Sequence, residues 1–424
     1  MHGSTRGRGR GGGVDGVEHI QDGRRPGGAG RSFPALFVRG GTSNGLVILR
    51  EHLPPTSEWP SVLASAMGSP DGYGRQLDGM GSGLSSTSKI CVLSASSRPD
   101  SDVEFTFVQV GIRDGSLDMA GNCGNMSSII GPVSLDEGLV KDPRILGEAA
   151  GESCSRHDDM AHTASTATAT ATTTALVRIY NTNTAKLIHA RFPFTGDPPR
   201  YCAKGDYAMD GVPGTGSKIV LSFLSPGGAK TGQTLPTGNP VDNLTLPDGS
   251  TIQASLVDVS NPGVFVRASD VVPDSLGGLD KLDPAAVEAN PALKARLEQI
   301  RRAGAARMGL DPNTESVPKI VVVFPPFPGR KNPGINIQCL ALSMGQAHKA
   351  VPLTLALCLG AAALLPGTIP CELALVAAAK GGVITIGHPS GSLDVSTTIR
   401  DGHVLSAELH RTAWVLMRGD VFYQ

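Results

Sequence analysis

The sequence predicts an α+β protein of two similar lobes with a cleft between them. Short apolar segments rich in β-branched residues recur along the chain between turns, and 54 glycines and 31 prolines among 424 residues supply those turns. Each half of the chain also contains one glycine-flanked helix start, at residues 121–125 in the first half and 343–345 in the second. If the lobes face each other, both helix starts lie at one site.

Length and composition divide the chain into a tail and two lobes. A chain of 424 residues is long for one hydrophobic core. Residues 1–32 are rich in Gly and Arg and lack apolar periodicity, so we expect a disordered tail. We expect the N-terminal lobe over residues 33–215 and the C-terminal lobe over residues 216–424. Residues 148–175 are polar and of low complexity, which predicts an insertion between strands of the first lobe.

The first lobe is expected to consist mainly of strands, with one helix. The predicted strands are apolar or alternating segments bounded by turn residues, and they cover residues 33–41, 45–50, 88–96, 102–112, 176–184 and 186–194. The helix is predicted to begin at Gly124 and to run through residues 126–139, with Pro132 bending it or ending part of it.

The second lobe repeats this pattern of strands around one apolar helix. Its predicted strands cover residues 218–224, 251–259, 263–269, 319–324, 335–342, 382–388, 391–399 and 412–422. Residues 283–308 predict a further helix, because leucine and isoleucine recur there at helical spacing. Ser343 and Gln346 have the spacing of a capping box, which predicts that they open the very apolar helix over residues 348–365.

The charge and the motif content argue against several classes of function. The 37 basic and 38 acidic residues nearly cancel, which argues against a general binder of nucleic acid or of membrane surfaces. The apolar run Ala350–Pro370 contains further prolines, so it predicts a buried helix instead of a membrane span. The sequence contains no metal-binding motif and no phosphate-binding motif, so we expect neither a metal nor a cofactor.

The cysteines bear on the cellular compartment. All seven are scattered, with no CxxC pair and no zinc-like spacing. Without a secretory segment, this pattern predicts reduced thiols and a cytoplasmic location. The arginine-rich tail leaves RNA binding and mitochondrial targeting as less favoured alternatives, because it also contains acidic residues and no amphipathic helix.

The sharpest local motif is Asp118-Met-Ala-Gly-Asn-Cys-Gly-Asn125, in which small and amide residues surround Cys123 just before the first helix. A thiol at a helix N-terminus lies near partial positive charge and unpaired backbone N–H groups, which stabilises the thiolate. The same N–H groups, with the side chains of Asn122 and Asn125, could cradle a carboxylate. The alternative is an inert, buried cysteine in a tight turn.

A second motif, Asp78-Gly-Met-Gly-Ser-Gly-Leu-Ser-Ser-Thr-Ser-Lys89, places glycines and hydroxyl residues before a lysine that begins an apolar strand. Loops of this kind present many N–H and O–H donors to anions. A lysine in an apolar strand is partly desolvated, which lowers its pKa toward the range in which it can act as an acid or a base. The alternative is a flexible surface loop followed by an ordinary lysine at a strand edge.

Three shorter segments have the same small-residue character. They are Arg39–Gly45, Ser343–His348 and His388–Gly391. Taken singly, His348 is more often a satisfied helix histidine, and the last segment is more often a plain turn. As a set, the five segments are all suited to hold anions, and none contains a metal or nucleotide motif.

These motifs, together with others in the same order, resemble one known family. The matching segments are RGGTSNG, MGSPDGYGRQLDGMGSG, SSTSK, GNCGN, LPTGN, RMGL, SMGQAHKA, HPSG and RTAxxLMxG, spread from about residue 34 to 422 and interrupted at residues 148–175. On these residues the chain resembles the PrpF family. That family includes 2-methylaconitate cis–trans isomerases, methylitaconate Δ-isomerases, 4-oxalomesaconate tautomerases and fungal aconitate Δ-isomerases.

The resemblance implies a fold like that of diaminopimelate epimerase, in which each lobe is a β-barrel-like sheet around a central helix and the site lies between the lobes. It also implies a cofactor-independent isomerase that shifts a proton and a double bond in an aconitate-like unsaturated polycarboxylic acid. Cys123 and Lys89 match the acid–base residues of the family. The substrate-binding positions carry over to Arg39, Thr42, Ser43, Ser86, Thr87, Asn122, Gly124, Asn125, Ser343, Met344, Gly345, His348 and Ser390.

Several alternatives stay open at this stage. Many family members have Lys or Arg where this chain has Asn44, so a third substrate carboxylate could be held differently or be absent. A keto–enol tautomerase of an oxalomesaconate-like acid and a non-catalytic polycarboxylate-binding homologue are alternative functions. A two-cysteine racemase is disfavoured, because the second helix start has Met344 and Gly345 where that class needs a thiol. Formation of a homodimer and the identity of the acid are left open.

The expected reaction removes a proton next to an alkene and a carboxylate, which leaves a delocalised anion for preorganised donors to stabilise. We expect either Cys123, as thiolate, or Lys89, as neutral amine, to take the proton, and the same group or the other to return it. Closing the two lobes over the ligand would exclude water from this step.

Overall fold

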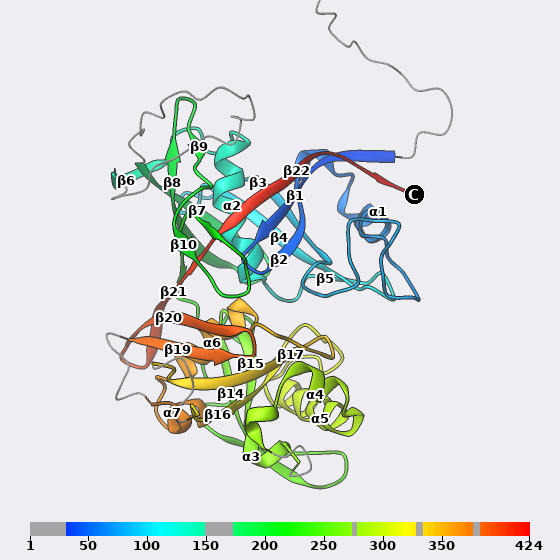
Figure 1. The fold of residues 1–424 in the computed structure, drawn as a ribbon, viewed down its shortest axis with the longest axis vertical. Helices are drawn as coiled ribbons and strands as arrows, with labels where there is room; N and C mark the ends of the chain where they lie inside the picture. The colour runs from blue at the N-terminus through cyan, green and yellow to red at the C-terminus, as the bar shows by residue number, and fades with distance from the viewer. Residues whose placement is uncertain (1–30, 149–172, 274–277, 328–333, 376–381) are drawn as a thin grey trace, which may run out of the picture.

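The computed structural model describes residues 31–148, 173–273, 278–327, 334–375 and 382–424, which form two lobes stacked along the long axis of the molecule (Figure 1). The predicted tail and the predicted insertion lie almost entirely outside these residues. The limits of the tail and of the insertion differ from the predicted 1–32 and 148–175. Strand β1 (Arg31–Gly40) already includes residues 31 and 32, and β7 (Thr173–Asn181) begins before residue 175. Both extensions pair with a neighbouring strand, β22 (Ala413–Tyr423) and β8 (Lys186–Thr195) respectively.

The N-terminal lobe is a curved sheet around helix α2 (Gly124–Asp136) (Figure 1). Its strands lie in the order β8-β7-β4-β3-β2-β1-β22, in which the β7–β4 and β3–β2 pairs are parallel and the others antiparallel. The bounds are β2 (Ser43–Leu49), β3 (Lys89–Ala95), β4 (Val103–Val110), β5 (Leu117–Asp118), β6 (Arg144–Glu148) and β9 (Arg200–Tyr201). Helix α1 (Trp59–Met67) packs with a second apolar cluster on the face of the sheet away from α2.

The C-terminal lobe is a second curved sheet, around helix α6 (Leu353–Ala362). Its strand order is β13-β14-β15-β16-β17-β19-β20-β21-β12, with parallel pairs at β15–β16 and β17–β19. The bounds are β12 (Ile219–Leu224), β13 (Asp242–Thr245), β14 (Thr251–Val259), β15 (Asn261–Arg267), β16 (Lys319–Phe324), β17 (Ile337–Ser343), β18 (Gln346–Ala347), β19 (Val383–His388), β20 (Gly391–Arg400) and β21 (His403–Arg411).

Most of the remaining helices pack on the outside of the second sheet. Helix α5 (Pro291–Arg307) shares an apolar cluster with strands β14 to β17, and α4 (Pro284–Glu288) lies beside it. The short helix α3 (Ala268–Val271) completes this layer. In contrast, α7 (Ile369–Leu373) shares the apolar cluster of α6. A small hairpin of β10 (Tyr207–Ala208) and β11 (Thr215–Gly216) lies apart from the main sheet.

The two central helices are buried because their residues are apolar or small all round. Every residue of α6 is buried, and so is the stretch Gly124–Leu135 of α2. A helix without a polar face is stable only when it is covered on all sides, which the curved sheets achieve. Pro132 does not end α2, which runs on to Asp136. The prediction of two α+β lobes, each with a sheet around a central helix, is confirmed.

The prediction for the start of the second central helix is wrong. Ser343 and Gln346 do not form a capping box, because they face each other as the last pair of a hairpin between β17 and β18. Between them, Met344 (φ 51°) and Gly345 (φ 66°) both adopt the left-handed region, as a two-residue hairpin turn requires. Helix α6 begins only at Leu353, directly after Pro352.

The last strand does not follow the predicted lobe limits. Residues 216–424 were expected to form the C-terminal lobe, but β22 runs antiparallel to β1 of the N-terminal lobe, from Tyr423 opposite Arg31 to Ala413 opposite Gly40. In addition, β12 pairs with β8 of the first lobe on one side and with β21 on the other, so one sheet continues through both lobes. The sequence of a strand does not specify its partner when the two are far apart along the chain.

Three further observations concern the described part of the chain. No helix in it is long and apolar enough to cross a membrane. Within the same residues, no group of three or more His, Cys, Asp or Glu side chains is placed to hold a metal ion. Cys202 is disulfide-bonded, which differs from the expectation of reduced thiols, while free thiols are found at Cys91, Cys123, Cys339, Cys358 and Cys371.

Candidate active site

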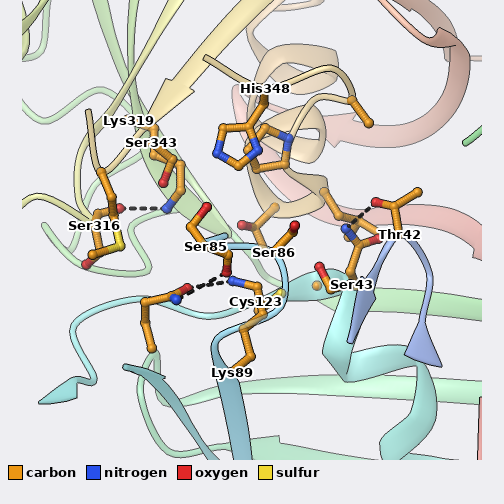
Figure 2. Close-up of a pocket in the computed structure, with 18 of the residues that line it drawn as sticks. Thr42, Ser43, Ser85, Ser86, Lys89, Cys123, Ser316, Lys319, Ser343 and His348 are labelled. Atoms are coloured by element: carbon orange, nitrogen blue, oxygen red, sulfur yellow. Dashed lines mark hydrogen bonds between the residues drawn. The ribbon is translucent and has the colours of Figure 1, made fainter. Parts of the chain in front are cut away.

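A cavity of about 450 Å³ lies between the two lobes (Figure 2). Most of the predicted site residues line it, namely Thr42, Ser43, Ser86, Lys89, Asn122, Cys123, Gly124, Asn125, Ser343, Met344, His348 and Ser390. Its charged lining consists of three lysines, Lys89, Lys319 and Lys349, and one carboxylate, Asp118. This excess of cations suits a ligand with several negative charges.

The N-termini of α2 and α6 meet beside this cavity. A Cβ atom added at Gly124 would collide with the side chain of Leu353, so a larger residue there would force Leu353 to move. Thr354 Oγ1 donates a hydrogen bond to the backbone oxygen of Asn122 at 3.4 Å. Two helix starts therefore meet at one site, but the second is at residues 352–354 and not at the predicted residues 343–345.

Cys123 is the residue that caps α2. Its backbone is extended (φ −110°, ψ 100°), its side chain is half-buried, and the first N–H groups of the helix follow it directly. These N–H groups have no acceptor within the helix and carry the positive end of the helix dipole, so they are suited to bind a carboxylate. The corresponding position at α6 is Pro352, and Cys339 and Cys358 are buried elsewhere in β17 and α6. Only one thiol is therefore found at the paired helix starts, as the sequence predicts.

Asn125 positions a hydroxyl group at the edge of the same helix. Its Nδ2 donates to Thr42 Oγ1 at 3.0 Å, and its Oδ1 accepts from Arg411 Nε at 3.2 Å. The amide thus bonds to two protein groups and holds the Thr42 hydroxyl at the cavity wall.

Lys89 begins β3 at the bottom of the cavity and is 8% exposed. Its Nζ donates to Gln109 Oε1 at 2.5 Å and lies 5.2 Å from the centre of the Phe107 ring. Burial lowers the pKa of Lys89, while the nearby thiols of Cys123 and Cys91 act in the opposite direction. The expected desolvated lysine is therefore present, with Cys123 among the groups around it.

Gln109 fixes the orientation of Lys89. Its Nε2 donates to the backbone oxygens of Ser85 and Ser88 at 3.1 and 2.8 Å, which leaves only Oε1 to face the lysine. The sequence did not reveal this contact, because Gln109 lies on another strand. It faces Lys89 only because β3 and β4 pair in this register.

Replacing Gln109 with Glu is expected to raise the pKa of Lys89, because an adjacent carboxylate favours the ammonium form. The limb of the kcat/KM pH profile that depends on neutral lysine should move to higher pH. At neutral pH, kcat/KM should fall about 10-fold. Gln253→Glu, an exposed change on β14 beside Arg267, is the matched control and should leave the profile unchanged. A profile unaffected by Gln109→Glu would show that Lys89 does not titrate in the reaction.

Lys319 is a functional candidate that the sequence interpretation missed. It begins β16, is 9% exposed and lines the cavity from the C-terminal lobe. Its Nζ donates to the backbone oxygen of Ser316 at 2.6 Å, and burial, followed by repulsion from Lys89, lowers its pKa to about 8. The pattern that drew attention to Lys89, a lysine at the head of an apolar strand, is repeated in KIVVVF and could have revealed it.

His348 lines the cavity as predicted, and its Nε2 is buried without a hydrogen-bond partner among the described residues. Burial lowers the pKa of His348 to about 4, with Lys89 and Lys319 acting in the same direction and a backbone hydrogen bond with Ser343 opposing them. The imidazole is therefore neutral at physiological pH and is available to a ligand as a hydrogen-bonding group.

This depressed pKa predicts an acid-sensitive fold. Between pH 6.5 and about 4 the unfolded chain protonates His348 and the native protein does not, so the free energy of unfolding falls as pH falls through this range. The contribution is on the order of 3 kcal/mol over the full range. His348→Gln should flatten the pH dependence of urea unfolding, whereas the exposed control His403→Gln should not. Equal slopes in wild type and His348→Gln would contradict the assignment.

Three predicted site residues do not line the cavity. The Arg39 guanidinium instead donates to the backbone oxygens of Gly41 and Thr412 at 2.9 and 3.0 Å, and so fastens the β1–β2 turn to the chain entering β22. Thr87 Oγ1 donates to the backbone oxygen of Leu84 at 3.1 Å within its own loop. Gly345 lies at the tip of the β17–β18 hairpin.

The side chain of Asn44 does not line the cavity either. On β2 it follows Ser43, which does, and it pairs with Arg39 across the β1–β2 ladder. Because side chains alternate along a strand, a cation at position 44 would lie on the side of the strand opposite Ser43. Asn44 therefore gives no reason to expect fewer carboxylates on the ligand.

Residues 31–148 and 155–424 match the family model described as PrpF protein. This chain belongs to the PrpF family. Its PrpF relatives include the 2-methyl-aconitate isomerase of Cupriavidus necator, 34% identical over 416 residues that cover 91% of this chain and 96% of the relative. The 3-methylitaconate isomerase of Eubacterium barkeri is 34% identical over 408 residues, which cover 92% and 97%. The (4E)-oxalomesaconate Delta-isomerase of a Novosphingobium strain is 35% identical over 395 residues, which also cover 92% and 97%.

A solved structure has the same fold. The crystal structure of a methylitaconate-delta-isomerase matches with a TM-score of 0.69 and 32% sequence identity, covering 93% of this chain and 96% of the other. Both the family predicted from the ordered motifs and the two-lobed fold implied by it are confirmed.

Proposed function

We propose that this PrpF-family protein is a cofactor-independent isomerase that shifts a proton and a double bond in an aconitate-like unsaturated polycarboxylic acid. The observation that carries the proposal is the pairing of Cys123, at the start of α2, with the buried Lys89 in one cavity between the lobes. A single thiol beside a desolvated amine suits removal of a proton from carbon and its return to another carbon.

In the proposed reaction, one of these two groups takes the allylic proton of the substrate, and the electron pair of the broken C–H bond spreads over the alkene and its carboxylate. The proton is then delivered to the far carbon by the same group or by the other, so the reaction is balanced without an oxidant or a further reactant. The negative charge on the intermediate is met by donors that are already in place. The N–H groups at the start of α2 and the Thr42 and Ser43 hydroxyls are donors at the same cavity.

The relatives support this reaction class. The three named above carry the names 2-methyl-aconitate isomerase, 3-methylitaconate isomerase and (4E)-oxalomesaconate Delta-isomerase, and each is aligned over more than nine-tenths of this chain. All three names denote isomerases of unsaturated acids with more than one carboxylate.

The experiment is ¹H NMR of the purified protein in D₂O with a panel of acids, namely cis- and trans-aconitate, 2-methylaconitate, methylitaconate and 4-oxalomesaconate. We expect one acid to isomerise and to gain deuterium at the carbon that receives the proton. Retention of ¹H at that carbon would indicate that a single shielded group carries the proton. If no acid isomerises and none exchanges a C–H proton with solvent, the proposed function is wrong, and a binding role would take its place.

A further inference from the structure

Lys319 occupies the position in the C-terminal lobe that Lys89 occupies in the N-terminal lobe. Lys89 begins β3, which is parallel to β2 and antiparallel to β4. Lys319 begins β16, which is parallel to β15 and antiparallel to β17. The repeated strand arrangement therefore brings one lysine to the cavity from each lobe, and Figure 2 shows Lys319 across the cavity from Lys89.

The surroundings of the two lysines differ. The thiol of Cys123 is the strongest charge partner of Lys89, whereas Lys319 is influenced first by Lys89 and then by Asp118, with Cys123 only after them. Figure 2 shows Lys319 on the side of the cavity opposite Cys123. Its Nζ is bonded to a neutral backbone oxygen, and no ion pair of Lys319 is found among the described residues. A buried ammonium without a counterion is unfavourable until an anion arrives.

A second donor on the same part of the cavity wall has no hydrogen-bond partner among the described residues. Ser316 lines the cavity, is 7% exposed, and its Oγ is buried with no hydrogen-bond partner among the described residues. The same residue accepts from Lys319 Nζ through its backbone oxygen at 2.6 Å, so both residues belong to the same part of the cavity wall. A hydroxyl and an ammonium on the same part of the wall can each donate to one oxygen of a carboxylate.

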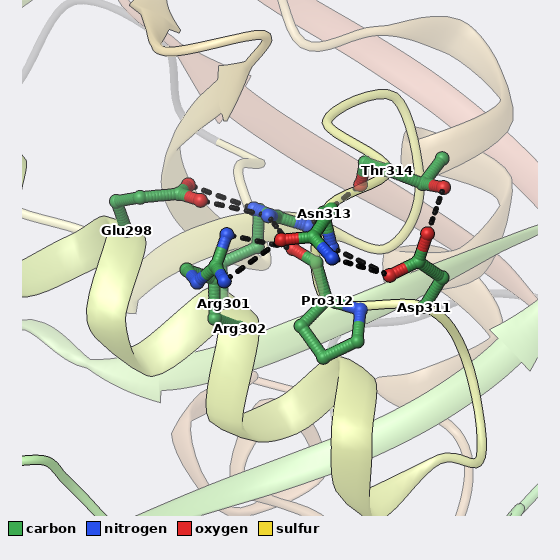
Figure 3. A network of polar contacts seen from close by, with 7 residues as sticks. All are labelled: Glu298, Arg301, Arg302, Asp311, Pro312, Asn313 and Thr314. Carbon is green, nitrogen blue, oxygen red and sulfur yellow. Dashed lines mark hydrogen bonds and ion pairs between the residues drawn. The ribbon is translucent and has the colours of Figure 1, made fainter.

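The segment that carries Ser316 is held rigidly. Arg301 of α5 is 3% exposed and donates to the backbone oxygens of Pro312 and Thr314 at 2.7 and 2.9 Å (Figure 3). Glu298 accepts from the same guanidinium at 2.7 Å, which fixes its orientation. The turn is closed by Asp311, whose Oδ1 accepts from the backbone N of Asn313 at 2.9 Å. Ser316 therefore follows a segment that is fastened to α5, as a preorganised binding site requires.

We propose that Lys319 and Ser316 form a carboxylate-binding subsite in the C-terminal lobe, which takes a substrate carboxylate on the side of the cavity away from Cys123. The inference rests on the proposed function and adds to it: the substrate must carry a carboxylate distant from the carbon that loses its proton. Lys319 is then a specificity-determining residue, and the proton is handled by Cys123 and Lys89 in the opposite lobe.

The test measures binding of propane-1,2,3-tricarboxylate, a saturated acid that has no double bond to shift, by calorimetry. Lys319→Met should weaken its affinity about 10²-fold, because a buried charge partner is removed. Ser316→Ala should weaken it about 10-fold, the scale of one hydrogen bond to a charged group. Lys281→Met, an exposed lysine of the same lobe, is the matched control and should bind as wild type. Because Ser316→Ala is a small change, it keeps the test valid if Lys319→Met fails to fold.

Kinetics with the acid identified by NMR separate binding from proton transfer. A rise in KM with kcat within a few-fold of wild type supports the subsite. A collapse of kcat with unchanged KM and unchanged tricarboxylate affinity overturns it and makes Lys319 a proton-transfer group. A third outcome is that no acid isomerises, the wild type binds the tricarboxylate, and Lys319→Met does not bind it. In that case the subsite stands and the proposed reaction fails. If wild type does not bind the tricarboxylate at all, the subsite is wrong.

Discussion

Replacing Cys123 with Ser is expected to lower kcat by about 10³-fold, the scale of a positioned acid–base group. Serine keeps the size and the capping position of the thiol, but its hydroxyl is far less acidic than a thiol and does not provide an anion at neutral pH. Cys123 forms no side-chain bond to its own helix, so the substitution should leave the free energy of unfolding nearly unchanged. Steady-state kinetics and urea unfolding of the same preparation measure both effects.

Cys371→Ser is the matched control for this change. Cys371 is also free and half-buried, but it lies in α7, away from the cavity lining, and its replacement should leave kcat unchanged. Alkylation by iodoacetamide should inactivate wild type, and the substrate should slow the inactivation. If Cys123→Ser retains more than about a tenth of kcat, Lys89 alone moves the proton and the thiol is not needed.

Replacing Lys89 with Met is expected to lower kcat by a similar factor, about 10³-fold, while the fold becomes no less stable. Methionine fills the space of the lysine stem, and the cost of burying an ammonium in this apolar strand disappears. The lowered pKa of Lys89 has the same physical origin, since burial disfavours the charged form. The free energy of unfolding should therefore stay the same or rise as activity is lost.

A second variant tests whether the missing group is an amine. Lys89→Ala leaves a space in the cavity wall, and added methylamine should restore part of the rate if proton transfer is what was lost. Wild-type activity in Lys89→Met would contradict the role of this residue. A large loss of stability in Lys89→Met would instead indicate that the bond to Gln109 at 2.5 Å is structural.

The two residues proposed as the acid–base pair could be located from the sequence because their signals are local. Cys123 lies beside glycines directly before a helix, and Lys89 follows a glycine-rich loop and begins an apolar strand. Each pattern is contained in about ten neighbouring residues, and the ordered family motifs strengthen both. The buried central helices were visible for the same reason, since each is an uninterrupted run of apolar and small residues.

What the sequence did not reveal depends on contacts between distant segments. Lys319 has the same local pattern as Lys89 but lacks a glycine-rich loop before it, and only the shared cavity shows that it belongs to the site. Arg39 was expected to bind the ligand, yet its partner Thr412 lies 373 positions further along the chain. The second helix start was misplaced because a hairpin turn and a helix cap use similar small residues. The cytoplasmic location and the homodimer stay predictions.

The return of β22 to β1 has a consequence for the order in which the protein is completed during synthesis. Strand β1 lies between β2, its neighbour in sequence, and β22, which follows every other described strand. The edge of the N-terminal lobe therefore stays open while the whole C-terminal lobe emerges from the ribosome, and an unpaired edge invites wrong partners. The lobe that is made first is the lobe that is finished last.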